Sequence, residues 1–107
     1  MSDAGQAKKQ SSSSLTHFVL TELNIGLQFV ALARDSYLRD LDSDGHRQRT
    51  AAIHAYQTAK SFLPQVDSTE TQRTMIEQRM VELGTALSDL EEILRRTNKI
   101  HPSNPDS

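Results

Sequence analysis

An apolar repeat in the C-terminal third of the chain constrains the fold more than any other feature. Its members follow at intervals of four, three, four, three and four residues: Ile76, Met80, Leu83, Leu87, Leu90 and Leu94. This spacing is typical of one face of an α-helix that packs along another helix. The repeat predicts a long helix over about residues 68–97, which ends near Asn98 and before Pro102. Because such a seam must be buried, the pattern favours an all-α fold.

A second apolar stripe predicts another long helix over about residues 15–41. Its members recur every three or four residues: Val19, Leu23, Leu27, Val30, Ala33, Tyr37 and Leu41. Gly26 interrupts this pattern and costs about 1 kcal/mol relative to Ala within a helix. The glycine therefore indicates either a kink or a close helix crossing.

A helix between these two is predicted over about residues 46–63. It follows an Asp-, Ser- and Gly-containing turn over residues 40–45 and ends at Pro64. One face carries Ala52, Ala55, Tyr56, Ala59, Phe62 and Leu63, and the alanines allow a neighbouring helix to approach closely. Beyond Pro64, the spacing of Asp67 (or Ser68) and Glu70 resembles a capping box for the last helix.

Short connections between the three helices predict an antiparallel three-helix bundle, with long first and third helices, over residues 15–97. A kink at Gly26 would instead fold the first helix back and give a four-helix arrangement. Residues 1–14 and 98–107 are polar or rich in Pro, and we expect disordered tails there. Ser14 would then cap the first helix.

The predicted lengths leave apolar residues uncovered at both ends of the bundle. At ~1.5 Å per residue the helices measure about 40, 28 and 45 Å, so the third would extend past the Asp-rich turn. The residues expected to lack cover are Leu15, Phe18 and Val19 at one end, and Leu90, Ile93 and Leu94 at the other. A folded-back first helix, a second copy in a homo-oligomer, or a helix of another protein would each cover them.

Composition excludes several kinds of chemistry. The 107 residues contain no Cys, which excludes a disulfide framework, a thiolate metal site and a cysteine nucleophile. Twelve Lys and Arg against 14 Asp and Glu give a net charge of −2, which disfavours a basic surface for nucleic acid. A modest basic end (Arg95, Arg96, Lys99 and His101) suits the dipole of the last helix. We expect no enzyme, no catalytic residues, no cofactor and no nucleic-acid partner.

The Asp-rich turn has the opening of an EF-hand calcium loop, Asp40-x-Asp42-x-Asp44-Gly45. The twelfth position is Ala51 instead of Glu, and Arg47 stands where an aliphatic residue belongs. We therefore interpret the segment as a turn that caps the second helix, with no metal site. A small calcium- or ligand-responsive sensor stays the alternative function. The histidines, which show no metal-ligand spacing, are His17, His46, His54 and His101.

The most apolar stretch, residues 15–33, is long enough to suggest a membrane span. It contains His17, Glu22, Asn24 and Gln28, and a glutamate inside hydrocarbon is costly. The first fourteen residues do not have the pattern of a signal peptide. We expect a cytoplasmic protein that does not bind a membrane.

The second predicted helix carries Ala52-x-x-x-Tyr56-x-x-Ala59-x-x-x-x-Pro64 and resembles the second helix of a tetratricopeptide repeat. The first helix departs from that repeat, since Ser36, Arg39 and Asp40 stand where an aromatic residue, a leucine and a glycine belong.

The order of residues over about 28–94 is similar to that of the microtubule-interacting-and-trafficking domain, a three-helix bundle. The matching positions are Ala33, Asp44, Gly45, Ala52, Tyr56 and Ala59, followed by Arg73, Ile76, Arg79, Glu82 and Leu83. The turn is about two residues longer than in that family. The resemblance implies a helical module that receives a partner's short helix in a groove between helices, without catalytic residues. We accordingly expect a non-enzymatic protein-interaction or assembly module.

Overall fold

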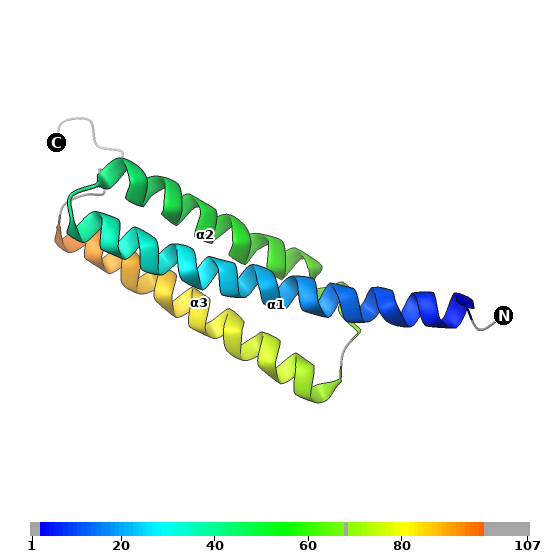
Figure 1. Cartoon of the computed structure of the whole chain (residues 1–107). Coiled ribbons are helices and arrows are strands. Elements are labelled where there is room, and N and C mark those ends of the chain that lie inside the picture. Colours follow the sequence, from blue (N-terminus) through cyan, green and yellow to red (C-terminus); the bar gives the residue numbers. More distant parts are fainter. Residues whose placement is uncertain (1–2, 68, 98–107) are drawn as a thin grey trace.

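The structure is a computed structural model that describes residues 3–67 and 69–97. It has three α-helices, α1 (Asp3–Leu38), α2 (Asp42–Phe62) and α3 (Glu70–Arg96), and a short 3-10 helix, η1 (Leu63–Gln65), after α2. Consecutive helices run antiparallel, so α1 and α3 point the same way (Figure 1). Within the described ranges there is no strand. The prediction of an all-α three-helix bundle is confirmed.

Helix α1 is the central element of the bundle. It packs against both α2 and α3, whereas α2 and α3 have few contacts with each other. The apolar stripe of α1 is buried between them, as its 3–4 spacing predicts. The core draws on all three helices and on the segment after η1: Val19, Leu23, Val30, Ala33, Tyr37, Ala52, Ala59, Val66, Ile76, Leu83, Leu90 and Leu94.

Gly26 lies where α1 packs closely against both α2 and α3. A Cβ atom at this position would be 2.6 Å from Cδ2 of Leu83 on α3 and 3.3 Å from Cβ of Ala55 on α2. Helix α1 passes through Gly26 without interruption. Of the two interpretations of this glycine, the close crossing is therefore the correct one. The described part of the chain does not form the alternative four-helix arrangement.

The helix boundaries differ from the predicted ones at several ends. Helix α1 begins at Asp3 and not at Leu15, so residues 3–14 are helical where a tail with a Ser14 cap was expected. Adding residues to an existing helix avoids the cost of nucleation, which lets a polar segment extend it. Helix α2 starts at Asp42, before the predicted start. The predicted tail at 98–107 lies outside the described residues.

The predicted uncovered ends are mostly covered. Val19, Leu90 and Leu94 are fully buried, and only Phe18, at 39%, is exposed, with its ring edge-on to Phe62 at 5.5 Å. The expectation failed because α2 is longer than predicted and the turn from η1 onward carries the chain further along α1. The contact between Gly26 and Leu83 then places the C-terminal ends of α1 and α3 at similar heights.

The start of α3 has a capping box two residues beyond the predicted one. Thr69 accepts a hydrogen bond from the backbone N–H of Gln72, and the Gln72 side chain accepts one from the Thr69 N–H, both at 3.1 Å. The predicted pairing with Glu70 is wrong because α3 begins at Glu70 itself. Thr–Gln serves the same purpose as Asp–Glu, since each pair satisfies two otherwise unpaired N–H groups.

Candidate interaction grooves

The Asp-rich turn serves to end α1 and begin α2. Asp40 adopts a positive φ of 62°, and the backbone N–H of Leu41 donates to the Ser36 carbonyl at 2.8 Å. The N–H of Asp40 donates to the carbonyl of Tyr37 at 3.1 Å, which completes a Schellman motif. Glycine is the usual residue at this position, so the sequence offers little signal of where α1 stops.

Two of the three aspartates of the turn belong to the start of α2. Asp42 and Asp44 lie in the first turn of α2, where the helix dipole favours negative charge, and Asp44 is ion-paired with Arg47. The predicted cap is not an aspartate, since the N-cap residue is Leu41. No group of three or more His, Asp or Glu among the described residues is placed to hold a metal ion. The calcium-sensor alternative stays a prediction without support from this geometry.

Side chains from α1 and α2 hold the corner between these helices. The Tyr37 hydroxyl lies 2.6 Å from Nδ1 of His46, and the Ser36 hydroxyl donates to Oε1 of Gln48 at 2.7 Å. Both Ser36 and Tyr37 are buried. His17 and His54 are exposed on the surface, and His101 lies outside the described residues.

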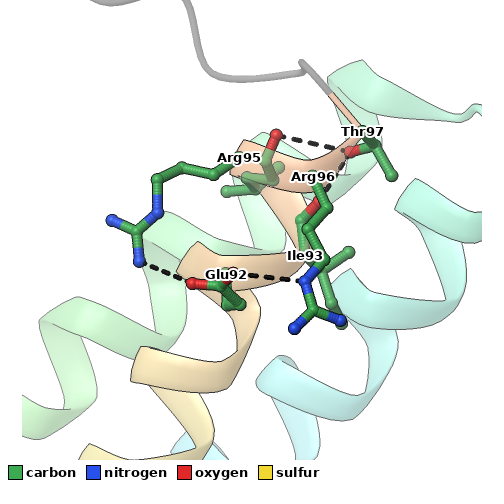
Figure 2. A network of polar contacts seen from close by, with 6 residues as sticks. Glu92, Ile93, Arg95, Arg96 and Thr97 are labelled. Atoms are coloured by element: carbon green, nitrogen blue, oxygen red, sulfur yellow. Dashed lines mark hydrogen bonds and ion pairs between the residues drawn. The ribbon is translucent and has the colours of Figure 1, made fainter.

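The basic end of α3 is largely neutralised within the helix. Glu92 accepts hydrogen bonds from Arg95 at 2.9 Å and from Arg96 at 3.2 Å (Figure 2). These bonds, the one from Arg95 foremost, hold the pKa of the exposed Glu92 carboxyl below its usual value of 4.5. Lys99 lies outside the described residues. The described part of this end therefore presents no cluster of unpaired positive charge.

One surface cavity is a groove between α1 and α3, which we call the α1/α3 groove. It has a volume of about 460 Å³ and a mostly apolar lining with charged residues among it: Leu27, Val30, Ala31, Arg34, Asp35, Leu38, Ala86, Asp89, Leu90 and Ile93. The Leu38 side chain is 63% exposed at one end of the groove. An exposed leucine beside an apolar groove is a favourable contact for another protein.

A second groove lies between α2 and α3 and is more polar. Its volume is about 470 Å³, and its lining is Tyr56, Met80, Val81, Gly84, Thr85, Ser88 and Asp89. An ion pair between Arg49 and Glu91 joins α2 to α3. Because α2 and α3 have few contacts, Met80 and Leu87 of the α3 seam are only half-buried.

Sequence reasoning missed the α1/α3 groove. It named Ile93 only as an uncovered end residue, and it gave Ala31, Arg34, Leu38, Ala86 and Asp89 no role. The sequence signal for this groove was the set of apolar residues that flank the buried stripe of each helix. Such flanking positions face a neighbouring helix only where that helix packs to one side of the stripe. The sequence alone does not reveal that offset.

Helix α1 contains a segment, Ser14–Leu38, that is long and apolar enough to cross a membrane by length and composition. Within this segment, Val19, Leu23 and Val30 belong to the core shared with α2 and α3. The core helix of a small bundle passes the same test of length and composition.

Comparisons of the chain with protein-family models, with curated proteins and with solved structures found no match. The resemblance to tetratricopeptide and microtubule-interacting-and-trafficking helices therefore stays a prediction.

Proposed function

We propose that this chain is a non-enzymatic, cytoplasmic interaction module that binds another protein through the α1/α3 groove. The observation that carries the proposal is the combination of an apolar groove of about 460 Å³ with the exposed Leu38 at its end. Removal of such apolar surface from water favours association, although only part of this free energy appears as affinity. Arg34, Asp35 and Asp89 along the groove would orient the partner, since charged groups at the rim set register more than affinity.

The α1/α3 groove is a better candidate than the α2/α3 groove. The α2/α3 groove has a lining in which polar side chains and a glycine are prominent, and outside this lining the ion pair between Arg49 and Glu91 joins the same two helices. A partner that widened this groove would have to break that pair. The α1/α3 groove has apolar side chains on both walls.

Photo-crosslinking in the source cells tests the proposal. A photo-reactive amino acid replaces Ala31 within the groove, and a matched variant carries it at Gln57, which is exposed on α2 and lines neither groove. We expect a crosslinked protein from position 31, lost when Leu38 is also changed to Lys, and none from position 57. Equal crosslinking from both positions, or none from position 31, would contradict the proposal.

A further inference from the structure

The two walls of the α1/α3 groove carry the same pattern of side chains. The α1 wall presents Ala31, Arg34 and Leu38, and the α3 wall presents Ala86, Asp89 and Ile93. Each wall therefore carries a small, a charged and a large aliphatic side chain at positions i, i+3 and i+7, which share one helix face. The charges are opposite, so the two walls are complementary to each other.

The matching residues also lie at similar heights along the bundle. Gly26 on α1 meets Leu83 on α3, and the two helices run in the same direction. From that crossing, Arg34 is eight residues further along α1 and Asp89 is six residues further along α3. At ~1.5 Å per residue these steps are about 12 and 9 Å, so the two heights differ by only about 3 Å. The same offset holds for Leu38 with Ile93.

We propose that the occupant of the α1/α3 groove is the same groove of a second copy of this chain. This inference rests on the proposed function and names the partner. A half-turn about an axis parallel to the groove places the α1 wall of each copy against the α3 wall of the other. Arg34 then faces Asp89 of the second copy and Leu38 faces its Ile93, and both contacts occur twice, as in any isologous interface.

The charges of this pattern are available for pairing between copies. In the ranges that the structure describes, neither Arg34 nor Asp89 forms an ion pair or a hydrogen bond through its side chain, and both residues are exposed. Asp35, the other charged lining residue, is paired with Arg39 at 3.4 Å. A second copy supplies the opposite charge for each free group beside an apolar floor, whereas an unrelated partner would need to reproduce this pattern by coincidence.

The first test is the mass of the purified full chain by light scattering over a wide concentration range. We expect the mass to rise from 12.0 kDa toward twice that value. Leu38→Lys should weaken the dimer at least roughly tenfold, because two symmetry-related leucine contacts are lost. Val81→Lys is the matched control, since Val81 is 67% exposed and lies in the α2/α3 groove.

Charge reversal then separates this interface from others. Arg34→Glu and Asp89→Arg should each weaken the dimer roughly tenfold, since each replaces two attractive pairs by two repulsive ones. The double variant should restore wild-type dimerisation. A dimer that is weakened further by the double variant, or weakened by Val81→Lys as much as by Leu38→Lys, would overturn the proposal.

Cysteine pairing tests the symmetry, and the chain has no cysteine of its own. An oxidised mixture of Arg34→Cys and Asp89→Cys should yield the mixed 34–89 disulfide in excess over 34–34 and 89–89, as measured by mass spectrometry. Equal or greater 34–34 product would exclude this axis. A chain that stays monomeric to about 1 mM while position 31 crosslinks to a different protein would overturn this inference and leave the proposed function standing.

Discussion

The aromatic ring of Tyr37 fills the space in which any residue other than glycine at position 45 would place its Cβ atom. A Cβ on Gly45 would lie 2.6, 2.7 and 2.9 Å from three carbons of that ring. The ring is fully buried, and its hydroxyl lies against His46 in the next position of α2. Tyr37 and Gly45 thus fix how closely the end of α1 approaches the start of α2.

Replacing Gly45 by Ala should therefore destabilise the protein. The clash with Tyr37 should cost about 1–3 kcal/mol, which exceeds the gain in helix propensity of up to ~1 kcal/mol. Gly84→Ala is the control, because its Cβ would lie 3.7 Å from the nearest atom of Tyr56. The Gly84→Ala variant should gain the higher helix propensity of alanine and be more stable than the wild type. Urea unfolding followed by circular dichroism measures both; a stabilised Gly45→Ala variant would refute the packing argument.

Asp40→Gly should stabilise the protein by roughly 1 kcal/mol. Asp40 holds a positive φ of 62°, which costs a residue with a Cβ about 1 kcal/mol and glycine almost nothing. The change also removes a negative charge from the C-terminal end of α1, where the helix dipole opposes it. Thermal unfolding of the two proteins gives the comparison. An unchanged or lower midpoint would mean that the Asp40 side chain contributes more than its backbone geometry costs.

Two leucines of the α3 seam should respond differently to the same change. Leu83→Asp should unfold the protein, because it places a carboxylate at a fully buried site beside Gly26. Leu87→Asp should cost less, about 1–3 kcal/mol, because Leu87 is half-buried and its carboxylate would reach water. Helicity and urea midpoints distinguish the two. Similar losses would show that α3 is rotated relative to this structure.

The hydrogen bonds on Glu92 give a pH-dependent contribution to stability. Since the pKa of Glu92 in the folded chain lies below 4.5, its ionised form stabilises the fold above that pH, and the contribution is lost as the pH falls through the folded pKa. The difference in thermal midpoint between wild type and Glu92→Gln should thus be constant above about pH 5 and vanish at lower pH. Glu77→Gln, on an exposed site of the same helix, is the control. A difference that grows on acidification would contradict this account.

The sequence predicted the elements whose signal is repeated along a helix. The spacing from Ile76 to Leu94 identified α3, and Ile76, Leu83, Leu90 and Leu94 are indeed fully buried. Patterns of this kind can be recognised in the sequence because the same face of the helix is buried at every turn. The two interpretations left open at Gly26 were resolved only by the position of Leu83, which no local pattern contains.

The helix ends and the groove were less predictable because each depends on a single local feature or on the offset between helices. Asp40 ends α1 in a conformation that usually requires glycine, and Thr69 caps α3 although Asp67 offered an equally good motif. The position of α3 along α1 follows from the length of α2 and the turn after it. An error of a few residues in the position of α3 is the reason why Leu90 and Leu94 were predicted to be exposed, whereas both are buried.

Because α1 is the shared partner of two helices that have few contacts with each other, the bundle is divided energetically into an antiparallel α1–α2 pair and a parallel α1–α3 pair. Detachment of α3 leaves the α1–α2 corner with its Tyr37 and Ser36 contacts intact, and Arg49 with Glu91 is the ion pair between α2 and α3 that must break. Amide protons of α3 should therefore exchange with solvent through an opening that requires less free energy than global unfolding. Occupation of the α1/α3 groove from outside would join α1 to α3 and slow that exchange.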